Sequence, residues 1–395
     1  MEESSGRAGA LGVIVDAAVV IEKGKIKDIL KKYTGSEGVD VKGAVVTPGL
    51  VDAHTHLVHG GFRTNEFVAR MQGASYLEIA KQGGGIASTV AATRKASLDQ
   101  LCREAKNRMD EAFAMGTTTM EIKTGYGLDV ATELKMLEVI RFLRKNHPMK
   151  IVATFLGAHA FPPELKKNRK EYVRLIVEEM LPQAADTGLV QFCDVFVEES
   201  AFTHEEAAVI LEAASHFGLK ARLHVDQITA GGGAEFAVSA SAVSAEHLDC
   251  ISDRGIRALA KEKVSAVLLP GASFFVRGHK PLRGRFPPAR KLIDAGVNVA
   301  LATDYNPGTN PCLNLFLMGT IGATQMGMTL DEVWKGITIN AAKSLLLEKE
   351  CGTIAPGKWG DLLILDADNE YFPFYRYGKN IVKGVVKQGS LHWNP

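Results

Sequence analysis

The segment AVVTPGLVDAHTH, residues 44–56, ends in two histidines, His54 and His56, which stand one residue apart after an apolar run. In a β-strand alternate side chains point to the same face, so both imidazoles can reach one metal ion from a single strand. A catalytic metal site needs further ligands and an open position for water. The pair alone leaves two interpretations open: metal ligands, or ordinary polar residues at the end of a buried strand.

Seven further segments share this short, apolar and β-branched character, and helical patterns separate most of them. The expected strands span residues 44–56, 117–124, 150–159, 189–197, 219–225, 242–248, 264–270 and 297–304. The expected helices span residues 98–115, 132–146, 204–217 and 253–262, and residues 312–327 and 329–346 continue the same layer. Ser252 is the expected N-cap of the helix 253–262.

This alternation of strands and helices predicts a parallel sheet that is covered on its outer face. Eight strands favour a closed (β/α)8 TIM barrel. An open doubly wound sheet fits less well, because no glycine-rich dinucleotide fingerprint follows the first strand.

The two ends of the chain differ from this pattern. Residues 12–31 and 361–393 carry short strands with Lys-Gly and Gln-Gly turn signals and without convincing helices. We therefore expect one small β-sandwich domain built from both termini, residues 1–48 and 352–395, beside a barrel of residues 49–351.

Composition excludes several classes of partner. The chain has 395 residues and a net charge of +1, so it lacks the basic footprint of a nucleic-acid or anionic-membrane binder. It has no apolar run of about eighteen residues, and its first residues lack the pattern of a signal peptide. The five cysteines are scattered and are expected to be reduced thiols. These features predict a cytoplasmic protein that acts on a small molecule.

Four more chemistry-bearing residues end separate expected strands: His159, His224, His247 and Asp304. Barrel enzymes place their catalytic groups at the carboxyl ends of the strands, so this placement favours the metal interpretation of His54 and His56. A metal lowers the pKa of its bound water toward 7, and a nearby carboxylate can accept the proton. The implied chemistry is hydrolysis of a C–N bond, with His247 orienting the water or stabilising the oxyanion.

Other residues allow more than one role. Arg63, after the first strand, could clamp a substrate carboxylate, and Tyr126 could add a hydroxyl to the same ligand. Lys123 could be a carbamylated metal bridge, although an ion-paired lysine is commoner. His59 remains open. The remaining histidines are expected to be ordinary solvated or packed residues: His147, His204, His216, His279 and His392.

VTPGLVDAHTH and ALATDYNPG resemble the metal-dependent amidohydrolase superfamily. Within it, GASYLEIAKQGGGIASTVAATRKAS, GTTTMEIKTGYGLD and TFLGAHAFPPE closely resemble the imidazolonepropionase family. The resemblance implies a homodimeric barrel with one zinc or iron ion. In that family the metal-activated water hydrolyses the ring C–N bond of 4-imidazolone-5-propanoate, which yields N-formimidoyl-L-glutamate in histidine degradation.

The resemblance also assigns individual residues. The implied metal ligands are His54, His56, His224 and Asp304. The implied substrate site consists of Arg63, Tyr76, Tyr126, His159, Asn306, Gly308 and Thr309. His247 matches a histidine near the attacking water, and Asp304 also has a catalytic role.

Gln227 departs from the family pattern, which usually has a glutamate three residues after the metal-binding His224. Glutamine cannot shuttle a proton, although it can hold a ring by hydrogen bonds. Asp304 and His247 would then carry the proton transfers, or the chain would be slower or prefer another substrate. The alternatives are therefore another cyclic-amide amidohydrolase, a heterocycle deaminase of the same superfamily, or a silent barrel used for binding. The four filled ligand positions argue against the last of these.

Overall fold

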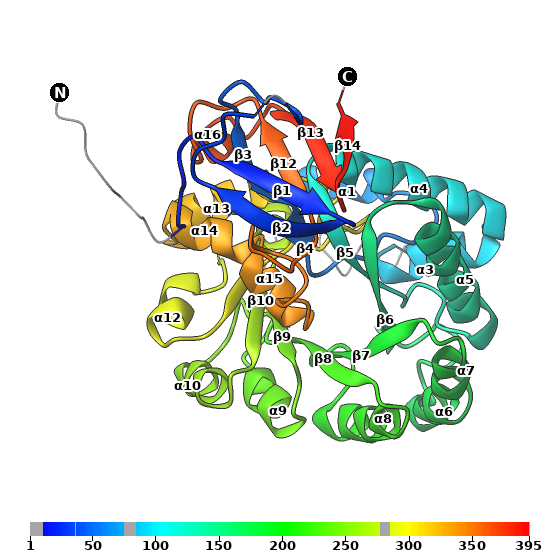
Figure 1. Cartoon of the computed structure of the whole chain (residues 1–395). Coiled ribbons are helices and arrows are strands. Elements are labelled where there is room, and N and C mark those ends of the chain that lie inside the picture. The colour runs from blue at the N-terminus through cyan, green and yellow to red at the C-terminus, as the bar shows by residue number, and fades with distance from the viewer. Residues whose placement is uncertain (1–10, 36, 75–83, 277–284, 395) are drawn as a thin grey trace.

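The computed structural model describes residues 11–35, 37–74, 84–276 and 285–394. At its centre is one sheet of eight parallel strands, in the spatial order β4 to β11 (Figure 1). The strands are β4 (Leu50–Asp52), β5 (Thr117–Lys123), β6 (Lys150–Ala158), β7 (Val190–Val197), β8 (Lys220–Val225), β9 (Ser244–His247), β10 (Ser265–Leu268) and β11 (Val299–Leu301). The expected (β/α)8 barrel is confirmed.

The barrel closes just beyond the ends of β4 and β11. The backbone N–H of Asp304 donates to the carbonyl of His54 at 3.0 Å, and that of His56 donates to the carbonyl of Tyr305 at 2.8 Å. The hydroxyl and the N–H of Thr303 both donate to the carboxylate of Asp52, at 2.6 and 3.0 Å. The hydrogen bonds that close the barrel therefore also hold His54, His56 and Asp304 beside one another.

Residues 44–56 do not form the single strand that the sequence suggested. They divide into β3 (Val45–Pro48), which belongs to a small antiparallel sheet, and β4, which belongs to the barrel. Pro48 has no N–H to donate to a neighbouring strand. Gly49 lies so close to Thr118 that an added Cβ would come within 2.3 Å of its hydroxyl. The break leaves β4 only three residues long, so His54 and His56 follow the strand instead of ending it.

Helices cover the outside of the barrel (Figure 1). They are α1 (Thr64–Met71), α3 (Ile86–Lys95), α4 (Leu98–Ala114), α5 (Val130–Asn146), α6 (Arg169–Leu175), the π-helical turn η1 (Ile176–Met180), α7 (Leu181–Asp186), α8 (His204–His216), α9 (Gly233–Ser239), α10 (Asp253–Glu262), α11 (Pro270–Phe275), α12 (Ala289–Asp294), α13 (Leu315–Gln325), α14 (Leu330–Gly336) and α15 (Ile339–Ser344). Ser252 caps α10 as expected, since its side chain accepts a hydrogen bond from the N–H of Gly255. The segment expected at 329–346 divides into α14 and α15 around Ile337 and Thr338.

The two ends of the chain meet in a small β-domain. Strands β14 (Ser390–Trp393), β13 (Val382–Lys387), β12 (Leu362–Leu365) and β3 form one antiparallel sheet in that order. The hairpin of β1 (Ala18–Glu22) and β2 (Lys25–Leu30) packs on it through Ile26. The Lys-Gly and Gln-Gly signals are the hairpin turns, where residues 23, 24, 388 and 389 all have positive φ.

The expectation that residues 361–393 hold no helix is wrong at one point. A short helix, α16 (Phe372–Tyr375), begins near Pro373 and buries Phe374. The ring of Phe374 lies 5.2 Å from that of Trp334 in α14 and 6.0 Å from that of Phe316 in α13. This packing, which local sequence does not reveal, stabilises the helical turn.

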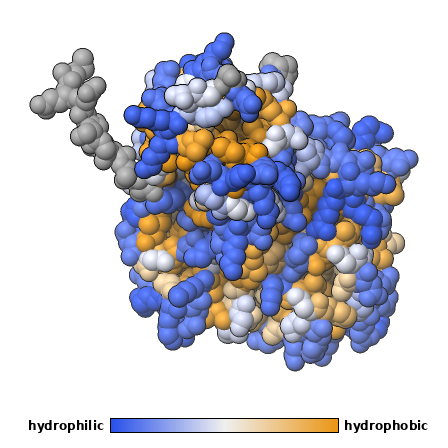
Figure 2. Space-filling model, in the orientation of Figure 1, coloured by the Kyte–Doolittle hydropathy of each residue, from blue (hydrophilic) through white to orange (hydrophobic). Residues whose placement is uncertain are grey.

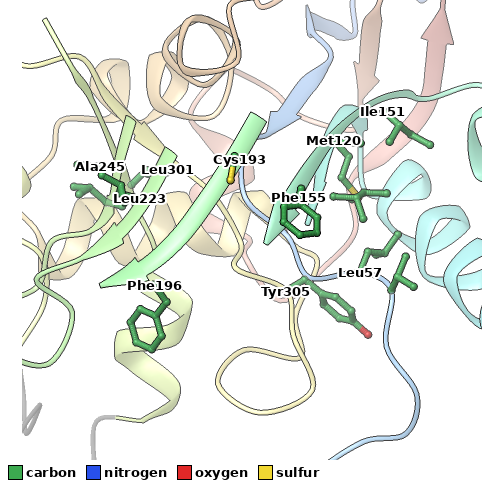
Figure 3. Packing of buried hydrophobic residues seen from close by; sticks show 14 of the residues in the cluster. Leu57, Met120, Ile151, Phe155, Cys193, Phe196, Leu223, Ala245, Leu301 and Tyr305 are labelled. Atoms are coloured by element: carbon green, nitrogen blue, oxygen red, sulfur yellow. The ribbon is translucent and has the colours of Figure 1, made fainter. Parts of the chain in front are cut away.

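Apolar side chains fill the space between the strands and the outer helices (Figure 3). Met120, Phe155 and Leu223 belong to this layer. Hydrophilic residues cover most of the outer helices on the face seen in Figure 2. Among the described residues, no helix combines the length and the apolar character needed to cross a membrane. The inward-facing side chains of the strands include buried charged residues such as Glu121 and Lys123, and they form part of the candidate site.

Candidate metal centre and substrate pocket

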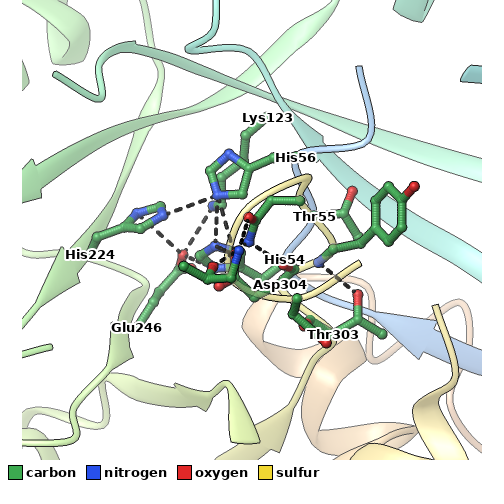
Figure 4. A network of polar contacts seen from close by, with 12 residues as sticks. His54, Thr55, His56, Lys123, His224, Glu246, Thr303 and Asp304 are labelled. Atoms are coloured by element: carbon green, nitrogen blue, oxygen red, sulfur yellow. Dashed lines mark hydrogen bonds and ion pairs between the residues drawn. The ribbon is translucent and has the colours of Figure 1, made fainter. Parts of the chain in front are cut away.

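Four of the predicted ligands meet at the carboxyl end of the barrel (Figure 4). His54 Nε2 lies 3.3 Å from His56 Nε2, and His56 Nε2 lies 3.4 Å from His224 Nε2. Asp304 Oδ1 lies 3.4 Å from the Nε2 atoms of both His54 and His56. All four residues are buried.

These separations fit a single metal ion. Zinc binds imidazole nitrogen at about 2.0–2.1 Å, and tetrahedral ligands at that distance lie about 3.3 Å from one another. Ring nitrogens directed at one point in this way can share a proton when no cation is bound, and can offer their lone pairs to a metal ion. His247 also lies close by, since its ring nitrogen and those of His54 and His224 fall within 4.8 Å of one another. The donor set of nitrogen and carboxylate oxygen suits zinc, iron and related ions.

Two carboxylates orient the imidazoles from behind. Glu246 Oε2 lies 2.6 Å from His54 Nδ1, and Asp194 Oδ2 lies 3.0 Å from His224 Nδ1. A carboxylate at Nδ1 fixes the ring orientation and leaves Nε2 directed at the metal position. Neither Glu246 nor Asp194 was among the residues predicted from the sequence.

Neighbouring charges set the protonation of these ligands. Burial and Lys123 lower the pKa of His54, but Glu246 and Asp304 outweigh them and raise it to about 9. Burial alone would raise the pKa of Asp304, yet its hydrogen bond to His54 and the charge of that histidine lower it overall. Burial and the neighbouring His159 hold the pKa of His56 well below its usual value. The region thus keeps Asp304 ionised and His56 neutral, the forms that bind metal.

Lys123 is an ion-paired lysine. Its Nζ lies 2.8 Å from Glu121 Oε1, 2.7 Å from Asp194 Oδ2 and 3.0 Å from Glu246 Oε2, and the side chain is fully buried. Burial lowers the pKa of Lys123, but the three carboxylates raise it above its ordinary value. A carbamate would place another anion among these carboxylates, so the geometry favours the ion-paired interpretation.

His247 stands beside the metal position in an unusual backbone conformation. Its φ is +74°, and that of the following Leu248 is +65°. Asp304 also has a positive φ, of +52°. Such angles cost energy for residues other than glycine and tend to occur at functional sites. Burial holds the pKa of His247 well below its usual value, so its imidazole is neutral at physiological pH.

His159 and Tyr126 line one side of the pocket. The His159 ring stacks on that of His56 at 4.9 Å, and the Tyr126 ring lies 5.2 Å from His159. His159 Nδ1 lies 3.0 Å from the carbonyl of Gly125 and donates to it in the neutral ring. Burial and the neighbouring His224 lower the pKa of His159 to about 3. Its Nε2 is therefore a hydrogen-bond acceptor at neutral pH.

Arg63, whose side chain is 11% exposed, brings a guanidinium to the same pocket. Its Nε is buried and has no hydrogen-bond partner among the described residues, and Glu66 lies 3.9 Å from its Nη1. The guanidinium packs on Gly308, where an added Cβ would meet Arg63 Nη2 at 1.4 Å. Its charge acts on both Tyr126 and His159. An incompletely paired guanidinium beside a phenol and a neutral imidazole is well suited to a carboxylate ligand.

Asn306 is used within its own loop. Its Oδ1 accepts from the N–H groups of Gly308 and Thr309, at 2.8 and 2.7 Å. Its Nδ2 donates to the carbonyl of Asp304 and to the hydroxyl of Thr309, both at 2.7 Å. The side chain therefore shapes the loop that supports Arg63.

The other predicted residues show no contact with the proposed metal ligands, or lie outside the described part of the chain. Gln227 lies in the bend after β8, half-buried, and its carbonyl faces the Cys250 thiol at 3.6 Å. His59 is buried against Arg63 and Arg108, and its Nδ1 lies 2.9 Å from the carbonyl of Gly61. Tyr76 and His279 lie outside the described residues.

The remaining histidines stay away from the site. His147 ends α5, His204 and His216 stand at the two ends of α8, and His392 lies in β14. These positions agree with the ordinary roles expected for them.

Four charged residues inside apolar strands were not predicted as part of the site, although the sequence pattern could have indicated them: Glu121, Asp194, Arg222 and Glu246. Each is an even number of positions from an inward-facing residue of its strand, so its side chain also points inward. On β8, for example, Arg222 and His224 share the inner face, while Leu223 packs outward. Outward-facing side chains of a barrel strand pack against apolar helices, so a charged residue inside such a strand is expected to point into the barrel.

Comparisons with known proteins identify the family of this chain. The sequence pattern of the amidohydrolase family matches residues 45–391. An imidazolonepropionase from Alkaliphilus metalliredigens is 45% identical over 383 residues, covering 97% of this chain and 90% of the relative. One from Treponema denticola is 46% identical over 380 residues, covering 94% and 91% respectively.

Solved structures share the fold at much lower identity. A 5-methylcytosine deaminase from Klebsiella pneumoniae has a TM-score of 0.73 and 17% identity, with 96% of this chain and 95% of that chain covered. A triazine hydrolase variant has a TM-score of 0.74 and 16% identity, with 95% and 90% covered. On the family pattern and the close relatives together, the chain belongs to the metal-dependent amidohydrolase family and, within it, to the imidazolonepropionases.

Proposed function

We propose that this chain hydrolyses 4-imidazolone-5-propanoate to N-formimidoyl-L-glutamate, the ring-opening step in histidine degradation. The single observation that carries the substrate assignment is Arg63, an incompletely paired guanidinium whose charge acts on Tyr126 and His159. A propionate group supplies the missing anion. An amide-containing ring then lies against His159.

One zinc or iron ion would be held by His54, His56, His224 and Asp304. When bound, it supplies a water molecule of lowered pKa and a positive charge next to the reacting carbonyl. The facing ring nitrogens at 3.3–3.4 Å and the carboxylates behind His54 and His224 support this assignment.

The chain's own residues position and protonate the reactants. Arg63 binds the propionate and Tyr126 donates its hydroxyl to the same group, while the lone pair of His159 Nε2 accepts a ring N–H. Asp304 Oδ1 faces the imidazoles, so its second oxygen accepts the proton of the attacking water. Asp304 then returns that proton to the departing ring nitrogen as the C–N bond breaks. His247, neutral and close to the metal position, orients the water and hydrogen-bonds the developing oxyanion.

The decisive experiment is turnover of imidazolonepropanoate by purified protein loaded with zinc, and in parallel with iron. Loss of the imidazolone absorbance should follow metal loading and should produce N-formimidoyl-L-glutamate. No ring opening above the metal-free control would overturn the proposal. A neutral heterocycle such as cytosine, tested in the same assay, separates it from the deaminase alternative.

We also propose a cytoplasmic homodimer. Apolar side chains of α1 and α11, namely Phe67, Val68, Met71 and Phe274, are exposed and offer a face for a second copy. Light scattering after size exclusion should give about twice the monomer mass. A monomer at micromolar concentration would contradict the dimer without affecting the catalytic proposal.

A further inference from the structure

A fully buried network of charges contacts the proposed metal ligands, and Figure 4 shows two of its members, Lys123 and Glu246, close to them. Its cations are Lys123 and Arg222, and its anions are Glu121, Asp194 and Glu246. Each of these side chains has 0% exposure. Ions buried this deeply are costly unless they are closely paired, so their arrangement calls for a role.

Lys123 is the common partner of the three carboxylates, and each carboxylate continues to a different part of the metal site. Asp194 reaches His224 Nδ1 at 3.0 Å. Glu246 reaches His54 Nδ1 at 2.6 Å. Both links run through the carboxylate oxygen that contacts Lys123.

Glu121 completes the set from the third side. Its Oε2 accepts from the backbone N–H of Thr55 at 3.2 Å, and its carbonyl accepts from the Thr55 hydroxyl at 2.6 Å. Thr55 stands between His54 and His56, so this link fixes the backbone that carries both ligands. The N–H of Lys123 itself donates to the carbonyl of Thr55 at 2.9 Å.

Arg222 supports the network from below but does not replace Lys123. It pairs with Glu246 Oε1 and donates to the carbonyls of Ser344 and Ala53, at 2.7 and 2.9 Å. Its Nε lies 3.9 Å from Glu121 Oε1, and it forms no ion pair with Asp194. Among the residues that the structure describes, Lys123 is the cation that pairs with all three carboxylates.

The charges of the linked set also favour a cation above it. Together with Asp304, the set holds four carboxylates against Lys123 and Arg222, which leaves two negative charges unmatched. A divalent ion at the ligand position would supply two positive charges against them. Loss of Lys123 would leave three carboxylates facing one another behind the histidines.

We propose that Lys123 is a positioning residue: by tying Asp194, Glu246 and Glu121 to one ammonium, it holds His224, His54 and Thr55 in the arrangement that retains the metal. This inference rests on the metal site of the proposed function, but it concerns how tightly the ion is bound and not which reaction is catalysed. Within the described part of the chain, the ion pairs of Lys123 are with these three carboxylates and with none of the four proposed ligands.

The test compares zinc release by the zinc-loaded wild-type protein and by Lys123→Met, which keeps the side-chain length without the charge. A colorimetric chelator in excess reports the release rate. Removing partners behind the ligands of a metal site costs about 10–100-fold in metal affinity, so we expect at least tenfold faster release. The absorption bands of the cobalt-loaded variant should also shift, because they report ligand geometry.

Lys387 provides a matched control. It is also a buried lysine, paired with Asp361 at 2.5 Å, but it lies in the small β-domain. Lys387→Met should lower the Tm while leaving zinc release and the cobalt spectrum as in the wild type. A folded Lys123→Met protein with wild-type release and spectrum overturns the proposal, as does a wild-type protein that binds no zinc.

A double variant separates positioning from charge. Lys123→Met with Glu121→Gln removes one cation and one anion, so much of the Tm lost by Lys123→Met should return while zinc release stays fast. Recovery of slow release would show that only the charge mattered, which contradicts the positioning role.

If Lys123→Met does not fold, Asp194→Asn and Glu121→Gln each cut one arm. Wild-type release from both of these variants then overturns the proposal. None of these measurements uses substrate, so zinc binding without ring opening defeats the proposed function alone.

Discussion

His159 keeps a free acceptor in the pocket because its surroundings prevent protonation. Its Nδ1 faces the Gly125 carbonyl, and burial beside His224 lowers its pKa to about 3. Arg63 acts on the same ring, and its Nε has no hydrogen-bond partner among the described residues. The role of an individual side chain in the pocket depends on its protonation, which its neighbours set.

Arg63→Ala should raise the KM for imidazolonepropanoate about 10–100-fold, with a smaller change in kcat. The reason is that a hydrogen-bonded ion pair to a ligand contributes about 1.5–3 kcal/mol. Steady-state kinetics measure both constants, and Arg174→Ala, which breaks only exposed pairs with Glu171 and Glu178, is the control. An unchanged KM in Arg63→Ala would mean that the carboxylate binds elsewhere.

Gln227→Glu should keep or raise kcat/KM, because a carboxylate near the site adds a group able to move a proton. Gln227→Ala tests whether the amide itself contributes hydrogen bonds to the ring. A large loss of activity in a folded Gln227→Glu protein would show that this chain requires glutamine.

The connections after the barrel strands decide where the ligands point. β4 ends at Asp52 and β11 at Leu301, yet His54 and Asp304 are held together by the backbone bonds that close the barrel. β9 ends at His247, and both His247 and the following Leu248 have positive φ. The helices that follow return the chain to the outer layer, and their caps fix where each begins.

Ser252→Ala should lower the free energy of unfolding by about 1 kcal/mol, because it removes the N-cap of α10. The Ser252 hydroxyl accepts from the Gly255 N–H at 2.9 Å and also lies 3.0 Å from Glu235 of α9. Urea unfolding measures the loss, and Ser252→Asp, which retains a capping oxygen, should recover much of it. Equal stability of the alanine variant and the wild type would contradict the capping role.

At the scale of the whole molecule, packed side chains connect the barrel to the small β-domain. Phe113 of α4 contacts His147 at the end of α5 and His392 of β14, with ring centroids 5.5 and 5.3 Å apart. Stability at this junction depends on pH, because His147 is 9% exposed and burial lowers its pKa to about 4 despite the nearby Asp110.

His147 should make the protein lose stability as the pH falls from about 6.5 to about 4. Its folded-state pKa lies below its unfolded value, so the unfolded chain binds the proton first in this window. The loss from this group is on the order of 2 kcal/mol. Denaturant unfolding of the wild type and of His147→Asn at several pH values should show a smaller slope for the variant. Parallel curves would contradict the assignment.

The sequence was enough to predict the architecture and to bring the candidate ligands to one rim. Strands of apolar, β-branched residues separated by amphipathic helices indicate a (β/α)8 barrel, because each element buries one face against the next. Residues near strand ends then gather at one rim by topology, and the resemblance to the amidohydrolase pattern selected His54, His56, His224 and Asp304 among them as the proposed ligands. The Lys-Gly and Gln-Gly turns also follow from local backbone preferences.

The tertiary structure alone decided how those ligands are held. The division of residues 44–56 at Pro48 and Gly49, and the helical turn at Phe374, depend on contacts with distant parts of the chain. The three carboxylates around Lys123 come from strands separated by up to about 125 positions in sequence, and no local pattern pairs them. Burial and the proximity of charges are properties of the folded lumen, so only the fold could show that Lys123 lies behind the histidines.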